Sequence, residues 1–125
     1  MNKILILDDN SSYIRALKNA LTDDFEIETA LTLKEAKEKT DKTIDIFLVD
    51  IRLDEKDQNN EDGLLFLDWI KKEYPKKPVI IMSAYLDNYK KDEIIKRGAT
   101  DILKKPILIA DLRKKIKELI KEGKH

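Results

Sequence analysis

The sequence predicts an α/β protein in which a parallel β-sheet is covered by helices on both faces. Three short runs of bulky apolar residues, 4–7, 46–49 and 79–82, are typical of strands that are buried on both sides. Each run ends at a polar residue, and a segment with helical signals follows it. Because strands and helices alternate along the chain, their connections fit a parallel sheet with crossover helices.

Composition indicates a single domain, residues 1–125, with a heavily charged surface. Apolar residues make up 42% of the chain and charged residues 40%. The 25 basic and 25 acidic residues cancel, so no overall field attracts nucleic acid or an anionic membrane. The absence of cysteine excludes disulfides and thiolate chemistry. The apolar run 4–7 is too short for a signal peptide or a membrane span, so we expect a cytoplasmic protein.

The first strand and the first helix are defined by a change in polarity. The strand covers residues 3–7 and ends at Asp8 and Asp9. The Asn-Ser-Ser run at 10–12 supplies side chains that cap helix N-termini. The helix that follows carries an apolar stripe formed by Ile14, Leu17 and Leu21.

The next segments predict an edge strand and a second helix. Residues 25–30 alternate between apolar and polar side chains, which suits the edge of a sheet. Thr32 and Glu35 have the spacing of a capping box, so a helix is expected to begin there and to run to about Lys39.

The central strand and the third helix are separated by a long polar loop. The strand at 46–49 ends at Asp50, and the loop extends from residue 52 to about 60. The helix begins near Glu61 and stops before Pro75. Its predicted core residues are Leu64, Phe66, Leu67 and Ile70.

The last third of the chain predicts two strands and two helices. A strand at 78–82 ends at Ser83, a helix covers about 88–97 with Gly98 as its C′ residue, and a short strand covers 101–104. The final helix carries a stripe formed by Leu112, Ile116, Leu119 and Ile120.

Right-handed crossovers leave few arrangements for five alternating strands and helices. We expect a flavodoxin-like (βα)5 fold, a doubly wound five-stranded parallel sheet in the order 2-1-3-4-5. This order makes the first and third strands neighbours, so Asp8 and Asp9 lie beside Asp50. Ser83 and Lys105 follow the fourth and fifth strands and reach the same carboxyl edge.

These five residues together suit phosphoryl transfer. Three crowded carboxylates repel one another and favour a bound cation, and oxygen ligands suit Mg²⁺. A carboxylate can also act as a nucleophile and form an acyl phosphate, while Lys105 and Ser83 can contact phosphoryl oxygens. Each residue alone is common in turns and caps, so the interpretation depends on their joint placement at one edge.

Six stretches, taken together, resemble the receiver domains of two-component response regulators, over essentially the whole chain. They are 4–9 (ILILDD), 47–50 (FLVD), 62–64 (DGL), 79–84 (VIIMSA), 98–99 (GA) and 105–106 (KP). The length resembles the stand-alone single-domain type.

The resemblance implies a role for each residue at the carboxyl edge. Asp50 would accept a phosphoryl group from a histidine kinase or a phosphotransfer protein. Asp9 would bind Mg²⁺ directly and Asp8 mainly through water. Ser83 would bond a phosphoryl oxygen. The resemblance further implies Asp50 and the backbone carbonyl of Arg52 as metal ligands, Lys105 as the partner of the phosphoryl group, and a cis Lys105–Pro106 bond.

The chain departs from the family pattern in its loop and in its switch region. Asp50 and Gly63 are thirteen residues apart, more than is usual, and the extra polar residues suit a surface insertion better than a cover or partner contact. Ile102 stands where the family often has an aromatic switch residue. Tyr85 either takes over part of that coupling or lines the entrance to the site.

A third departure lies on the third helix. Leu65 and Trp69 are one turn apart and off the predicted core stripe. They form either an exposed patch for a partner or a surface over which the long loop packs, and we favour the second interpretation.

The favoured function is a phosphorylation-switched module that catalyses only its own phosphorylation and dephosphorylation. Its output would be contact with an unknown downstream protein, with phosphorylation-dependent homodimerisation as an option and no direct contact with nucleic acid or membrane. One alternative is an adaptor that keeps the fold but no longer depends on phosphorylation. The other is a small Mg²⁺-dependent phosphatase with an aspartyl nucleophile.

Overall fold

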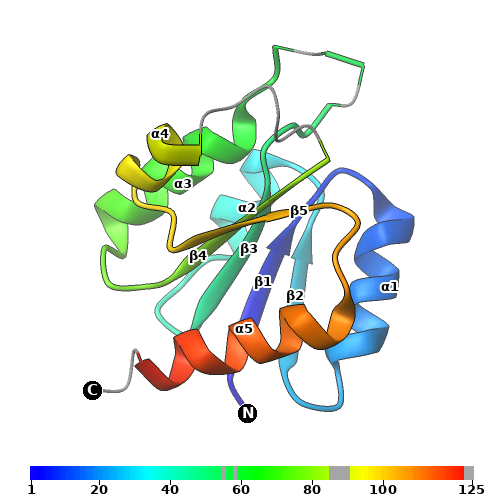
Figure 1. Cartoon of the computed structure of the whole chain (residues 1–125). Helices are drawn as coiled ribbons and strands as arrows, with labels where there is room; N and C mark the ends of the chain where they lie inside the picture. The colour runs from blue at the N-terminus through cyan, green and yellow to red at the C-terminus, as the bar shows by residue number, and fades with distance from the viewer. Residues whose placement is uncertain (55, 58, 85–90, 123–125) are drawn as a thin grey trace.

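Five parallel strands form one sheet in a computed structural model that describes residues 1–54, 56–57, 59–84 and 91–122. The sheet order is β2-β1-β3-β4-β5, so the predicted flavodoxin-like order is confirmed (Figure 1). The strands are β1 (Lys3–Leu7), β2 (Glu26–Ala30), β3 (Ile46–Asp50), β4 (Val79–Ser83) and β5 (Asp101–Lys104).

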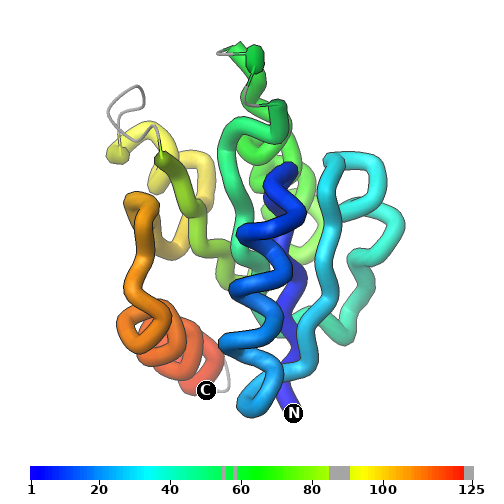
Figure 2. Tube along the Cα trace, turned by 90° about the vertical axis from the view of Figure 1, so that its right-hand side faces the viewer, coloured from blue at the N-terminus to red at the C-terminus, as the bar shows by residue number. Residues whose placement is uncertain are grey.

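Helices cover both faces of the sheet, as Figures 1 and 2 show. α1 and α5 pack on one face, and α2, α3 and α4 pack on the other. None of the helices in the described ranges is long and apolar enough to cross a membrane. The helices are α1 (Ser11–Leu21), α2 (Leu33–Lys39), α3 (Asp62–Glu73), α4 (Lys91–Lys96) and α5 (Ile109–Glu122).

The helix ends follow from side-chain and backbone chemistry. The side-chain oxygen of Asn10 accepts a hydrogen bond from the backbone N–H of Tyr13 at 3.0 Å, so it caps α1. The hydroxyl of Thr32 accepts from the N–H of Glu35 at 3.1 Å and caps α2. Gly98 follows α4 with φ of +115°, a backbone conformation that favours glycine. The start of the fourth helix, expected near residue 88, lies outside the described residues.

The central strands are buried on both faces, which explains their unbroken apolar sequence. Every residue of β3 and β4 is buried. Phe47 and Val49 of β3 point to the side of α2 and α3, whereas Ile46 and Leu48 point to the side of α1 and α5. Both layers therefore depend on β3, and its last residue, Asp50, is held by packing from either side.

The loop between β3 and α3 closes on itself and projects beyond the sheet (Figure 2). The amide oxygen of Asn60 accepts hydrogen bonds from the N–H groups of Leu53 and Asp62, both at 3.0 Å. Backbone turns join Asp54 to Asp57 and Asp57 to Asn60. The described residues of this loop thus bond mainly to one another at the surface, which is consistent with an insertion.

The favoured interpretation of Leu65 and Trp69 is wrong, because the loop does not cover both. Leu65 is 52% exposed. Trp69 instead stacks on Phe66 at 5.7 Å between ring centroids and contacts Tyr74 edge-on at 6.1 Å. The ammonium of Lys37 lies 5.8 Å from the Trp69 ring, so α2 contributes to its surroundings.

Candidate functional site

The strand registers bring the predicted site residues to one edge of the sheet. Leu7 of β1 pairs with Val49 of β3, so Asp8 and Asp50 are the next residues along neighbouring strands. On the other side of β3, β4 ends at Ser83, which pairs with Lys104 of β5. Lys105, the next residue, therefore lies at the same edge as Asp8, Asp50 and Ser83, and the predicted convergence of these residues is confirmed.

Asp8, Asp9 and Asp50 form an acidic cluster. One carboxylate oxygen from each lies within 4.8 Å of the others. Asp8 is fully buried and Asp50 is 7% exposed. One oxygen of Asp8 is held by the N–H of Asn10 at 2.9 Å, which orients the carboxylate. Such crowding of like charges raises the electrostatic free energy of the folded chain unless a cation compensates it.

The acidic cluster has the dimensions of a magnesium site. Octahedral Mg²⁺ binds oxygen at about 2.0–2.1 Å, so opposite ligands lie about 4.2 Å apart. One oxygen from each carboxylate of the cluster lies within 4.8 Å of the others, so the three can approach one ion, and carboxylate oxygens are the ligands that Mg²⁺ prefers. The residues therefore fit a hard divalent cation after a small movement of their side chains.

Lys105 supplies an internal positive charge to this cluster. Its Nζ lies 2.6 Å from Oδ2 of Asp8 and 3.7 Å from Oδ1 of Asp50. Burial is the largest single influence on the pKa of Lys105 and lowers it, but the carboxylates of Asp50 and Asp8 together outweigh burial. The pKa is therefore raised, and the ammonium remains charged at neutral pH.

The backbone around Lys105 joins the fourth and fifth strands. The N–H of Lys105 donates to the carbonyl of Ser83 at 2.9 Å. The Lys105–Pro106 peptide bond is cis, which confirms the expectation from the resemblance. Ser83 itself is 1% exposed at the end of β4. Its hydroxyl therefore belongs to the same buried edge as the carboxylates.

Gly63 lets α3 approach the backbone of Asp50. The N–H of Gly63 donates to the carbonyl of Ile51 at 2.9 Å. A Cβ atom at position 63 would lie 1.9 Å from the backbone oxygen of Asp50, far inside van der Waals contact. Only glycine fits here, which gives a physical reason for the glycine of the DGL stretch.

The structure describes two of the three remaining predicted site residues. Arg52 is 5% exposed, two residues after Asp50, and the role of its carbonyl stays a prediction. Ile102 is 9% exposed and packs in the core cluster on the side of α3 and α4. Tyr85 lies outside the described residues.

Tyr13 is a site residue that is not evident from the sequence. Its ring centroid lies 4.4 Å from Nζ of Lys105. In the sequence it is only the neighbour of Ile14 on a helix, and nothing in the helical periodicity relates it to a lysine 92 positions away. The sole signal is its place in the first turn after the Asp8–Asp9 pair, close to the carboxyl edge.

Comparison with known proteins agrees with this geometry. The family model of the response regulator receiver domain matches residues 4–117. The chain therefore belongs to the response regulator receiver domains of two-component signalling. Members of this family bind Mg²⁺ at an acidic pocket, and they interact with histidine kinases or phosphotransfer proteins and with downstream targets.

Relatives include both long regulators and isolated receiver domains. The DNA-binding transcriptional regulator NtrC of Klebsiella pneumoniae is 37% identical over 105 residues, which cover 81% of this chain and 21% of that protein. The chain thus spans about a fifth of the length of this curated relative.

Solved structures of receiver domains match nearly the whole chain, and two examples illustrate this. The CheY-like receiver domain protein of Methanospirillum hungatei JF-1 has a TM-score of 0.84 at 28% identity, covering 99% of this chain and 97% of that one. A receiver domain protein from Clostridium thermocellum has a TM-score of 0.84 at 30% identity, covering 99% and 98%.

Proposed function

We propose that residues 1–125 form one phosphoacceptor unit in which Asp50 receives a phosphoryl group from a histidine kinase or a phosphotransfer protein. The observation that carries this proposal is the cluster of Asp8, Asp9 and Asp50 carboxylates within 4.8 Å, with Lys105 beside it. The fold alone does not need these buried charges. Their arrangement suits neutralisation of a transferring phosphoryl group.

The chain's own residues divide the chemistry between them. A carboxylate oxygen of Asp50 is the nucleophile: it forms a bond to phosphorus while the donor's leaving group takes the electron pair of the broken bond. Asp9, Asp50 and the backbone carbonyl of Arg52 would hold Mg²⁺ directly, and Asp8 would hold it mainly through water. When bound, this ion neutralises charge on the phosphoryl oxygens. Water later attacks phosphorus, the bond between phosphorus and the Asp50 oxygen breaks, and inorganic phosphate leaves, which restores the Asp50 carboxylate.

Phosphorylation then changes the charge of the buried edge. The bound phosphoryl group carries about two negative charges and several strong acceptor oxygens, while Asp50 loses its own carboxylate charge, so the edge gains about one negative charge. The Lys105 ammonium, 3.7 Å from Asp50, is close enough to pair with it, and the Ser83 hydroxyl lies at the end of the adjacent strand. Redirecting these two groups alters the end of β4 and the start of the segment after β5, and this surface would carry the signal to a downstream protein.

Incubation with acetyl phosphate, with and without Mg²⁺, tests this function. Intact-mass spectrometry should show one added phosphoryl group only when Mg²⁺ is present, and peptide mapping should place it on Asp50. The adduct should disappear in Asp50→Asn and persist in Asp45→Asn, the matched control, which changes a carboxylate just before the opposite end of β3.

The alternatives give different results in the same experiment. A wild-type chain that stays unmodified with Mg²⁺ present would support the phosphorylation-independent adaptor. Repeated hydrolysis of an added phosphomonoester would indicate the aspartyl phosphatase. An adduct that survives in Asp50→Asn would assign the nucleophile to another residue.

A further inference from the structure

Tyr13 lies against the Lys105 ammonium on the side of α1. The backbone of Tyr13 is fixed, because its N–H donates to the Asn10 cap at 3.0 Å in the first turn of α1. The ring packs against the apolar cluster between the sheet, α1 and α5. Its centroid is 4.4 Å from Nζ of Lys105, well within the range of a cation–π interaction.

In the described part of the chain, three groups from different segments contact the ammonium. Nζ of Lys105 lies 2.6 Å from Oδ2 of Asp8, which follows β1, and 3.7 Å from Oδ1 of Asp50, the last residue of β3. It lies 4.4 Å from the centroid of the Tyr13 ring, which belongs to α1. A lysine ammonium has three N–H donors on a flexible stem, so two carboxylates alone leave it free to rotate between them. The aromatic face supplies the third contact.

The tyrosine hydroxyl does not explain why the ring lies there. Among the described residues, Oη of Tyr13 has no hydrogen-bond partner, and the atom is shielded from solvent. Burial is also the main influence that raises the pKa of Tyr13. Burying an unpaired hydroxyl is unfavourable, so the position of the ring is maintained by contacts of its carbon face.

We propose that Tyr13 is a positioning residue whose aromatic face holds the Lys105 ammonium over the acidic cluster before phosphorylation. The consequence for phosphoryl transfer rests on the proposed function. A lysine side chain loses rotamer entropy when it is immobilised. The ring imposes much of this ordering in the resting protein, so less remains to be imposed when the phosphoryl group arrives at Asp50.

The first test reads the contact directly and does not involve phosphorylation. In NMR spectra of the unmodified protein, the ring current of Tyr13 should shift the Lys105 ε-methylene resonances upfield, and Lys105→Met identifies these signals by their loss. The shift should persist in Tyr13→Phe and vanish in Tyr13→Leu. Lys105 resonances that are identical in wild type and Tyr13→Leu would overturn the proposal.

The second test measures the effect on transfer. With saturating Mg²⁺, the initial rate of modification by acetyl phosphate should fall about fivefold in Tyr13→Leu and stay within about twofold of wild type in Tyr13→Phe. Tyr74→Leu is the matched control, since Tyr74 is another partly buried tyrosine and lies on the opposite face of the sheet. Its rate should equal that of wild type.

Two results would contradict this role of the ring. If Tyr13→Phe is as slow as Tyr13→Leu, the hydroxyl and not the aromatic face is required. If Tyr13→Leu reacts at the wild-type rate, the contact has no effect on transfer. Failure of the proposed function is distinguishable from both, because wild type would then remain unmodified while its ring-current shift persists.

Discussion

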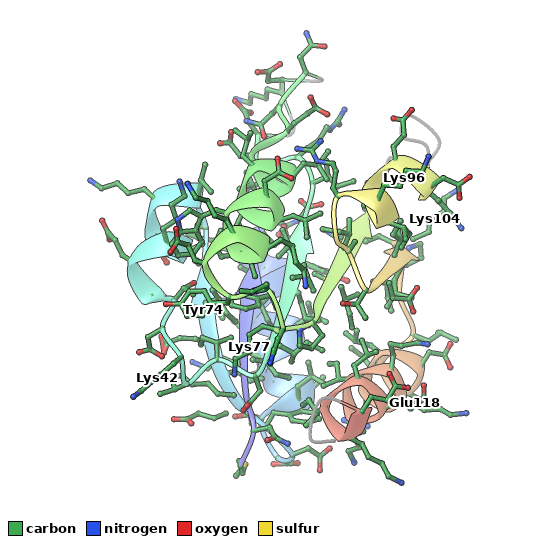
Figure 3. The ribbon with its side chains drawn as sticks, turned by 90° about the vertical axis from the view of Figure 1, so that its left-hand side faces the viewer. Lys42, Tyr74, Lys77, Lys96, Lys104 and Glu118 are labelled. Carbon is green, nitrogen blue, oxygen red and sulfur yellow. The ribbon has the colours of Figure 1, made fainter. Side chains whose placement is uncertain are left out.

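Charged residues differ in their surroundings between the amino edge of the sheet, where the parallel strands begin, and the carboxyl edge, where they end. At the amino edge, the Asp45 carboxylate accepts a hydrogen bond from the backbone N–H of Lys3 at 2.8 Å. Nζ of Lys77 reaches the carbonyl of Lys42 at 3.4 Å on the exposed surface (Figure 3). At the carboxyl edge, Asp8 and Asp50 are buried next to a third carboxylate, with Lys105 beside them. Burying like charges is unfavourable for folding, so this difference supports the proposal that the functional site lies at the carboxyl edge.

The largest expected difference in stability between variants at the two edges comes from replacing one glycine at each edge. Gly63→Ala should destabilise the protein by more than about 3 kcal/mol, because the new Cβ would meet the backbone oxygen of Asp50, which cannot move aside. Gly98→Ala at the amino edge should cost about 1–2 kcal/mol, because its positive φ is unfavourable but the clashing atoms belong to the flexible Lys71 side chain. Urea unfolding of both variants measures this order, and equal losses would contradict it.

A smaller difference is expected when one lysine is neutralised at each edge. Lys105→Met should cost about 2–3 kcal/mol in the absence of divalent ions, since it leaves three crowded carboxylates without their internal cation. Lys3→Met, which removes an exposed contact at 3.5 Å to Thr43 and a charge near the exposed Asp41, should change stability by less than about 0.5 kcal/mol.

Magnesium distinguishes the charge effect of Lys105→Met from a packing effect. Thermal unfolding with added Mg²⁺ should recover most of the loss, because the ion replaces the missing positive charge. A loss that is insensitive to Mg²⁺ would mean that the lysine stem, and not its charge, stabilises this edge.

The smallest expected effects on stability come from neutralising one aspartate at each edge, and they should have opposite signs. Asp50→Asn should stabilise the metal-free protein by about 1 kcal/mol, because it removes one of three repelling carboxylates while Asp8 keeps its close contact with Lys105. Asp45→Asn should destabilise it by about 0.5–1 kcal/mol, because it weakens a hydrogen bond that a charged group makes to the N–H of Lys3. Chemical denaturation without divalent ions measures the free energy of unfolding of both variants. If both changes had the same sign, the proposed difference between the two edges would be contradicted.

The parts of the fold that depend on local pattern could be predicted from the sequence. The apolar run at 46–49 is long enough to be buried on both sides, and Asp50, the first polar residue after it, is the last residue of the strand. Cap residues such as Asn10 and Thr32 act within one helical turn, so their partners are visible in the sequence. Once the strand order is known, the meeting of Asp8 with Asp50 follows from geometry.

Features that depend on side-chain packing between distant elements could not be predicted. Trp69 lies off the core stripe of α3, yet Phe66 and Tyr74 offer it an aromatic surface, and Leu65 one turn earlier remains exposed. The contact of Tyr13 with Lys105 requires the path of the chain after β5, which no periodicity in α1 records. Helical spacing assigns a residue to a face of its own helix, but it does not specify the neighbour on that face.

The ion pair between Asp8 and Lys105 joins residues that are 97 positions apart. During synthesis the three acidic side chains are all made before the lysine that offsets them. Until the ribosome has added the segment after β5, the nascent chain carries mutual repulsion at the edge where β1 and β3 must align. The internal ion pair of this edge therefore requires the whole sheet, because Lys105 follows its last strand.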